Sequence, residues 1–148
     1  MDKKLIVFRG IPGSGKSTMA KTLQKSYICA GYTTALYEAD MYFMTESGEY
    51  KFDGKLLGKA HEWCRNKVSE ALDRCQVVIV ANTNLTEKDM KIWEELAKEK
   101  SSDMDVFHLL TDFGTIHGVP QETIDKMKER EIDWPGEIKI TAIQRNEK

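Results

Sequence analysis

Hydrophobic positions follow two different patterns along the chain. Short apolar runs, typical of strands buried on both faces of a parallel sheet, are separated by longer segments whose apolar residues recur at helical spacing. Strands are expected at Lys4 to Phe8, Thr33 to Glu38, Val77 to Ala81, Met104 to Leu110 and Ile138 to Ile143. Helices are expected at Lys16 to Ala30, Lys55 to Asp73, Thr86 to Lys100 and Pro120 to Glu131. Alternating strands and helices favour an α/β fold with a parallel sheet covered on both faces.

Polar loops follow the first three of these strands. A glycine-rich loop follows the first, Glu38 and Asp40 follow the second, and Asn82-Thr83-Asn84 follows the third. The carboxyl ends of parallel strands meet at one edge of the sheet, where α/β folds bind their ligands. We therefore expect the candidate chemistry to lie at this edge.

The glycine-rich loop carries the most specific motif. Residues 10–17 fit the pattern of a glycine, four residues and Gly-Lys-Ser, placed between a strand and a helix. The glycines let backbone amides turn toward phosphate oxygens, and the first amides of the helix add partial positive charge. We expect ATP or a similar nucleoside triphosphate here, with Lys16 on the β- and γ-phosphates and Ser17 on Mg²⁺. The predicted nucleotide-binding residues are Gly10, Pro12, Gly13, Ser14, Gly15, Lys16, Ser17 and Thr18.

Asp40 is the candidate general base. A kinase that phosphorylates a hydroxyl needs a carboxylate to accept the proton close to the transferred phosphorus. Asp40 lies just after the second strand and so at the predicted ligand edge, and Glu38 is the weaker alternative. A helix cap or a turn-forming role is the competing interpretation of Asp40.

Composition and charge narrow the class of protein. The 148 residues fit a single domain spanning 1–148. The net charge of −2 argues against a protein that binds duplex nucleic acid through contacts to many phosphates. No apolar stretch approaches the length needed to cross a bilayer, so we expect no membrane partner and a cytoplasmic location. The three cysteines, Cys29, Cys64 and Cys75, lack metal-ligand spacing and are expected to be reduced, buried thiols.

Several motifs, in order along the chain, carry a resemblance to a known family. They are Gly-Ile-Pro-Gly-Ser-Gly-Lys-Ser-Thr at 10–18, Glu-Ala-Asp-Met-Tyr-Phe at 38–43, Gly-Glu-Tyr-Lys-Phe-Asp at 48–53, Ala-His-Glu-Trp at 60–63, Asn-Thr-Asn-Leu at 82–85 and His-Gly-Val-Pro at 117–120. With them the chain resembles the bacteriophage polynucleotide 5′-hydroxyl kinase domain and its cellular P-loop relatives.

The resemblance implies a fold and a reaction. The fold would be a P-loop NTPase-type three-layer sandwich, with about five parallel strands in the nucleoside-kinase-like order 2-3-1-4-5. The reaction would be transfer of the γ-phosphate of ATP to a hydroxyl, dependent on Mg²⁺, with Lys16 as a catalytic residue and Asp40 as the base. A polynucleotide 5′-hydroxyl is the implied acceptor. Small-molecule kinases and nucleotide-binding modules without transfer remain alternatives.

Two departures from the family pattern bear on activity. Relatives commonly carry an acid just before the Asn-Thr-Asn segment, where this chain has Ala81, and they place an arginine-rich lid helix before the His-Gly-Val-Pro turn. Here only residues 111–116 fill that gap, so the clamp that would stabilise transition-state charge is abbreviated. Arg130 is the candidate substitute, and a solvated surface charge is its competing interpretation.

Candidate substrate residues come from two segments. Asn82 and Thr83 either bind substrate or only shape the turn after their strand. Lys51 lies between Tyr50 and Phe52, a combination that suits a single-stranded or terminal nucleic acid, although a solvated face is the alternative.

Overall fold

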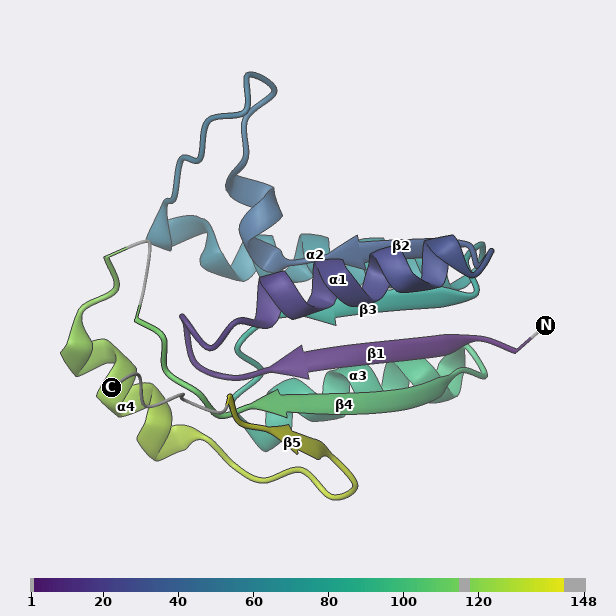
Figure 1. The fold of residues 1–148 in the computed structure, drawn as a ribbon. Helices are drawn as coiled ribbons and strands as arrows, with labels where there is room; N and C mark the ends of the chain where they lie inside the picture. The colour runs from purple at the N-terminus through teal and green to yellow at the C-terminus, as the bar shows by residue number, and fades with distance from the viewer. Residues whose placement is uncertain (1, 115–117, 143–148) are drawn as a thin grey trace, which may run out of the picture.

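Five parallel strands form the central sheet of the computed structural model, which describes residues 2–114 and 118–142 (Figure 1). The strands are β1 (Lys4–Arg9), β2 (Thr34–Tyr37), β3 (Val77–Ala81), β4 (Asp103–Leu109) and β5 (Ile138–Ile140). Their order is β2-β3-β1-β4-β5, and every neighbouring pair is parallel. The predicted α/β class and the predicted strand order 2-3-1-4-5 are both confirmed.

The helices differ from the expected ranges mainly at their ends. They are α1 (Lys16–Cys29), α2 (Leu57–Leu72), α3 (Glu87–Glu99) and α4 (Gln121–Arg130), with 3₁₀ turns η1 (Ala39–Phe43) and η2 (Gly54–Leu56). Thr86 caps α3 through a capping box with Asp89, as the spacing of these residues predicted. The last strand is shorter than the predicted Ile138 to Ile143, because β5 ends at Ile140 and the described residues 141 and 142 lie outside it. Ile143 and His117 lie outside the described residues.

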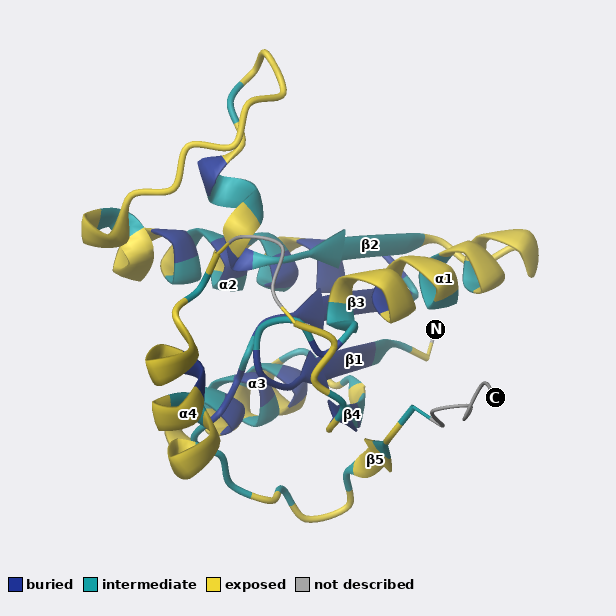
Figure 2. Cartoon of the chain, turned by 60° about the vertical axis from the view of Figure 1, so that its left-hand side comes forward, coloured by how far each residue is buried: buried dark blue, intermediate teal, exposed yellow. Residues whose placement is uncertain are grey.

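Helices cover both faces of the sheet, giving the predicted three layers. Ala20 of α1 packs on one face with Ile6, Phe8 and Ile79. The other face is covered by α2 and α3, whose buried residues pack against Leu5, Val7, Val78 and Val80. Figure 2 shows β1 and β3 buried at the centre, with exposed residues on the outer surfaces of the helices. Successive strand residues point to opposite faces, so a continuous apolar run supplies both cores.

The short helix α4 lies apart from these layers, at the carboxyl edge of the sheet (Figures 1 and 2). Its buried residue Ile124 packs with Ile11 of the glycine-rich loop and with Leu85. This apolar contact places α4 beside the candidate site.

The cysteine prediction is wrong for one residue. Cys64 and Cys75 are buried free thiols as expected, but Cys29 is exposed, because it ends α1 on the side of the helix that faces away from the sheet. Within the described residues, no helix has the length and apolar character needed to cross a membrane.

Candidate functional site

The loop between β1 and α1 has the backbone geometry of an anion nest. Gly10, Gly13 and Gly15 have φ angles of +152°, +80° and +91°, which residues with side chains rarely adopt. A Cβ built on Gly10 would lie 2.6 Å from the carbonyl oxygen of Leu109. Any larger residue would therefore displace the end of β4 from the loop.

Ser14 gives a further indication that the loop suits a polar ligand. Its Oγ is buried and has no hydrogen-bond partner among the residues that the structure describes. Buried polar atoms are nearly always paired, so an unpaired hydroxyl in a loop of this shape is an exception that calls for an explanation. The glycine backbone and this hydroxyl fit the triphosphate that the motif predicts.

Lys16 lies at the start of α1 with its amine directed at the loop. Its Nζ donates a hydrogen bond to the carbonyl oxygen of Ile11 at 2.9 Å. Burial lowers the pKa of Lys16 to about 8, although the negative charges of Glu38, Asp40 and Glu131 act in the opposite direction. The two acids of the β2–η1 segment are therefore close enough to Lys16 to act on its charge.

Glu38 is bonded directly to the predicted metal ligand. The hydroxyl of Ser17 donates a hydrogen bond to Oε1 of Glu38. A hydroxyl oxygen and a carboxylate oxygen side by side are the hard ligands that Mg²⁺ prefers. Glu38 was only the weaker candidate base in the sequence, and this contact gives it a different candidate role as the carboxylate of the metal site.

Asp40 lies in η1, exposed, two residues after Glu38. Its Oδ1 accepts a hydrogen bond from the hydroxyl of Tyr50 at 3.3 Å. Burial raises the pKa of Tyr50, and the nearby Asp40 carboxylate raises it further. Tyr50 comes from the segment that follows η1 and returns through an isolated bridge with Met44, a pairing that the sequence did not reveal.

Asn82 is hydrogen-bonded to the backbone of the segment that carries Glu38 and Asp40. Its Oδ1 accepts the backbone N–H of Ala39 at 2.8 Å, and its Nδ2 lies 3.6 Å from Sγ of Cys64. Asn82 is buried, so the structure gives it the task of fixing the backbone between Glu38 and Asp40. Thr83 is half-buried, and its carbonyl oxygen accepts the N–H of Gly10 at 3.1 Å.

The remaining predicted site residues are exposed or half-buried. Thr18 is exposed in the first turn of α1, and Pro12 is half-buried in the loop. Lys51 is exposed and pairs with Glu49 at 3.5 Å. Arg130 is exposed at the end of α4 and makes no hydrogen bond or ion pair within the described residues. The structure thus does not bring Arg130 to the loop.

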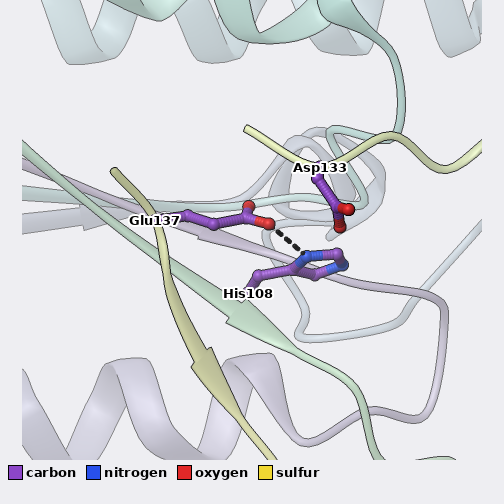
Figure 3. A group of neighbouring side chains, drawn as sticks. All are labelled: His108, Asp133 and Glu137. Carbon is purple, nitrogen blue, oxygen red and sulfur yellow. Dashed lines mark hydrogen bonds and ion pairs between the residues drawn. The ribbon is translucent and has the colours of Figure 1, made fainter. Parts of the chain in front are cut away.

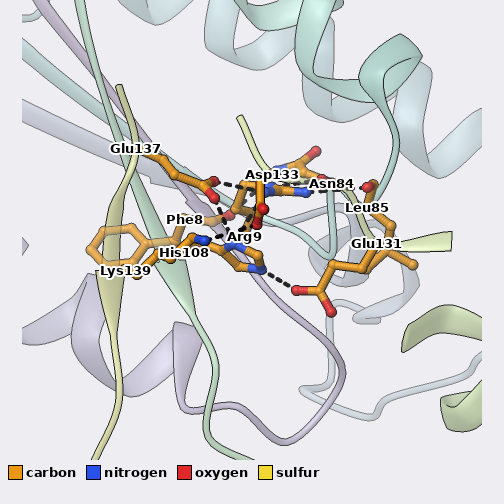
Figure 4. Close-up of polar contacts among 9 residues, drawn as sticks. All are labelled: Phe8, Arg9, Asn84, Leu85, His108, Glu131, Asp133, Glu137 and Lys139. Carbon is orange, nitrogen blue, oxygen red and sulfur yellow. Dashed lines mark hydrogen bonds and ion pairs between the residues drawn. The ribbon is translucent and has the colours of Figure 1, made fainter. Parts of the chain in front are cut away.

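A buried ionic cluster is built around Arg9, the residue directly before the glycine-rich loop (Figure 4). Arg9, the last residue of β1, donates hydrogen bonds to the carbonyl oxygens of Asn84 and Leu85 at 3.0 and 3.1 Å. It also donates to Oε2 of Glu137 at 2.7 Å, and its Nη1 lies 3.2 Å from Nδ1 of His108. Arg9 is therefore bonded to the loop after β3 and to the segment before β5.

His108 extends this cluster to the segment after α4. Its Nδ1 is 2.9 Å from Oε1 of Glu137, and its Nε2 is bonded to Glu131. Burial lowers the pKa of His108, but the carboxylates of Glu131 and Glu137 outweigh it, and the pKa is raised. The ion pairs of His108 therefore stabilise the folded protein fully at pH values below the pKa that this histidine has in the unfolded chain. That stabilisation is lost as the pH rises through the pKa of His108 in the folded protein.

Three members of this region have the spacing of metal ligands. One ligand atom each from His108, Asp133 and Glu137 lies within 4.8 Å of the others (Figure 3). These atoms already have partners, because Glu137 binds Arg9 and His108, and Asp133 pairs with Lys139 at 3.0 Å. The guanidinium of Arg9 supplies the positive charge that a metal ion would otherwise provide.

Solved structures of P-loop kinases share the fold. The chain aligns with a gluconokinase from Sinorhizobium meliloti at a TM-score of 0.60 and 16% identity, covering 96% of this chain and 84% of that one. It aligns with the APS kinase CysC of Mycobacterium tuberculosis at 0.58 and 14%, covering 87% and 96%. A structure of the Pnkp1/Rnl/Hen1 RNA repair complex gives 0.57 and 19%, covering 91% and 41%. At these identities the likeness establishes a P-loop kinase fold.

Sequence comparisons identify the family. The human protein NEDD4-binding protein 2 is 40% identical over 96 residues, which are 64% of this chain and 5% of that protein. The chain thus spans a small part of the length of this relative. A family model described as chromatin associated protein KTI12 matches residues 4–147. Because that match covers nearly the whole sequence and agrees with the P-loop fold, the chain belongs to the family of chromatin associated protein KTI12.

Proposed function

We propose that this protein is a magnesium- and ATP-dependent phosphotransferase that transfers the γ-phosphate of ATP to a 5′-hydroxyl of a polynucleotide. One observation carries the proposal. Lys16 and Ser17 open α1 opposite the acidic segment after β2, so that Glu38 contacts Ser17 and both Glu38 and Asp40 act on the charge of Lys16. Phosphate-binding groups and a candidate base thus face the same space, as a kinase requires.

The glycine-rich loop would bind the nucleotide. Its backbone amides and the amine of Lys16 would hold the phosphates, and the charge of Lys16 would stabilise the negative charge that develops on the transferred group. Ser17 and Glu38 would hold Mg²⁺, which supplies charge neutralisation between the β- and γ-phosphates. Glu38 takes the place of the acid that relatives carry where this chain has Ala81.

Asp40 would act on the hydroxyl that accepts the phosphate. Its carboxylate would accept the proton of the attacking hydroxyl, and the hydroxyl of Tyr50 holds that carboxylate in place at 3.3 Å. Lys51 lies next to Tyr50 and would contribute charge toward a nucleic-acid end. The choice of a polynucleotide acceptor rests on the motif resemblance.

A nucleotide-binding module without transfer is the second candidate. The observation that favours it is that residues 110–120, between β4 and α4, contain no arginine, whereas relatives carry an arginine-rich lid there. Arginine clamps are worth about 10³–10⁵ in rate in related reactions. A chain that lacks one would bind ATP and transfer phosphate slowly or not at all.

Transfer of label to an oligonucleotide separates these candidates. The protein is incubated with Mg²⁺, γ-labelled ATP and a short RNA or DNA that ends in a 5′-hydroxyl, beside the same oligonucleotide with a 5′-phosphate. Label is expected only on the 5′-hydroxyl strand, and Lys16→Ala is expected to lower the rate by about 10²–10³ because it removes one stabilising charge. ATP binding without transfer to any oligonucleotide would contradict the polynucleotide kinase proposal.

The lowered pKa of Lys16 predicts a pH dependence of ATP binding. With a pKa of about 8, the amine of the free protein is partly neutral at pH 8, and bound phosphate favours its charged form. ATP affinity is therefore expected to fall as the pH rises from about 7 to 9, and binding at pH 8 should take up protons. Calorimetry in two buffers of different ionisation enthalpy measures this uptake.

Lys16→Arg is the control for that experiment, because arginine stays protonated throughout this pH range. Any ATP binding that this variant retains should proceed without proton uptake. Proton release by the unmodified protein, or uptake that persists in Lys16→Arg, would show that another group is responsible.

A further inference from the structure

One exposed aromatic side chain lies directly against the phosphate loop. Phe113 follows β4, and 65% of its surface is exposed. A Cβ built on Gly15 would lie 3.5 Å from Cε2 of its ring, so the ring lies beside this glycine. A large apolar side chain that is mostly in water gains little from burial. Its position over the loop is therefore the feature to explain.

The backbone that carries Phe113 is held on several sides. The N–H of Phe113 donates to the carbonyl oxygen of Gly13 at 2.9 Å, which joins this segment to the loop itself. Asp112 accepts the N–H of Gly114 at 2.9 Å and pairs with Lys128 of α4 at 3.3 Å. The exposed ring is thus placed by fixed backbone and by α4, as a preorganised binding group would be.

The ring lies beside Gly15, the glycine directly before Lys16 and the start of α1. In loops of this kind the glycine backbone amides cradle the α- and β-phosphates, while the lysine reaches the β- and γ-phosphates. The nucleoside is attached to the α-phosphate and so leaves the loop near Gly15 and the start of α1. Phe113 lies next to the place where the nucleoside would leave the loop, because Gly15 has no side chain between its backbone and the ring.

We infer that Phe113 is the stacking platform for the base of the bound nucleoside triphosphate. The ring offers a flat apolar face and no hydrogen-bonding group, so it recognises an aromatic base by stacking and treats adenine and guanine alike. This inference rests on the nucleotide binding in the proposed function. It assigns a role to the segment between β4 and α4, where relatives carry an arginine-rich lid.

Two ligands separate a contact to the base from support of the loop. ATP and inorganic tripolyphosphate, each with Mg²⁺, are titrated calorimetrically into the unmodified protein and into Phe113→Ala and Phe113→Trp. Tyr32→Ala is the matched control, since Tyr32 is an aromatic residue that is 46% exposed just beyond the opposite end of α1. Thermal unfolding of each variant confirms that it is folded.

Phe113→Ala is expected to weaken ATP binding about tenfold, the size of one base–aromatic stacking contact, with tripolyphosphate binding unchanged. Phe113→Trp should retain ATP binding, and Tyr32→Ala should change the affinity for neither ATP nor tripolyphosphate. Equal weakening of both ligands by Phe113→Ala, or no weakening of ATP, would overturn the inference while leaving the proposed function intact. If the unmodified protein binds neither ligand, the proposed function itself fails.

Discussion

Asparagine in place of Asp40 is expected to lower phosphate transfer about 10²–10⁴-fold, the usual contribution of a general base. The amide cannot accept the proton of the attacking hydroxyl, yet it keeps the shape of the carboxylate and can still accept the hydrogen bond from Tyr50. Asp40 is exposed, and among the described residues its side chain is hydrogen-bonded to Tyr50 alone, so the affinity for ATP should change little. Single-turnover transfer and calorimetric ATP binding measure the two effects separately.

Two further variants make this result specific. Glu46→Gln removes one exposed negative charge from the segment that follows η1 and should leave transfer unchanged. Glu38→Gln replaces the carboxylate next to Ser17 with a neutral amide, so it should raise the Mg²⁺ concentration that transfer requires. If Asp40→Asn keeps its turnover while Glu38→Gln loses it at saturating Mg²⁺, the base is Glu38.

Methionine in place of Arg9 is expected to destabilise the fold by about 3–5 kcal/mol, the typical cost of removing one partner of a buried ion pair. The change leaves the carboxylate of Glu137 without its guanidinium partner and the carbonyl oxygen of Asn84 without a donor, whereas the carbonyl oxygen of Leu85 keeps the N–H of Ile132 at 3.0 Å. Burial raises the pKa of Glu137, but hydrogen bonds from His108 and Arg9 more than offset this and lower it. Urea unfolding at pH 7 measures the loss.

Lys4→Met is the matched control, on the same strand. Lys4 pairs with Asp105 at 2.9 Å, but the two side chains are 38% and 44% exposed. Exposed pairs contribute about 0–1 kcal/mol, so this variant should be nearly as stable as the unmodified protein. Glu137→Gln is a milder variant that keeps the size of the side chain and should fall between the two. Equal stability of Arg9→Met and Lys4→Met would show that the cluster does not stabilise the fold.

The main elements were predictable because each has a local cause. Val77 to Ala81 is apolar at every position, which only a strand covered on both faces can bury. The α3 helix begins where Thr86 and Asp89 have the spacing of a capping box, and the loop at 10–17 has the glycines that its positive φ angles require. These signals act over a few residues, so they can be read without knowing the partners.

The site was only partly predictable. The motif identified Lys16 and Ser17, and the topology directed attention to Asp40, but the bond between Ser17 and Glu38 joins residues from two different strand ends. Asn82 was a candidate for substrate contact, whereas its buried amide holds the backbone of Ala39. Which polar groups of adjacent loops pair with one another depends on the exact register of the strands, which composition and spacing leave open.

The sequence by itself determined the succession of strands and helices along the chain, the glycine-rich loop and the residues that begin α1. These features depend on secondary-structure propensity, hydrophobic periodicity and the conformational freedom of glycine, which all act locally. Tertiary structure alone decided that Arg9 is buried with His108 and Glu137, residues separated by up to 128 positions in the chain. It also decided that Phe113 lies beside Gly15. The physical reason is the same in both cases, since burial of charge and placement of a ring depend on neighbours that only the folded sheet brings together.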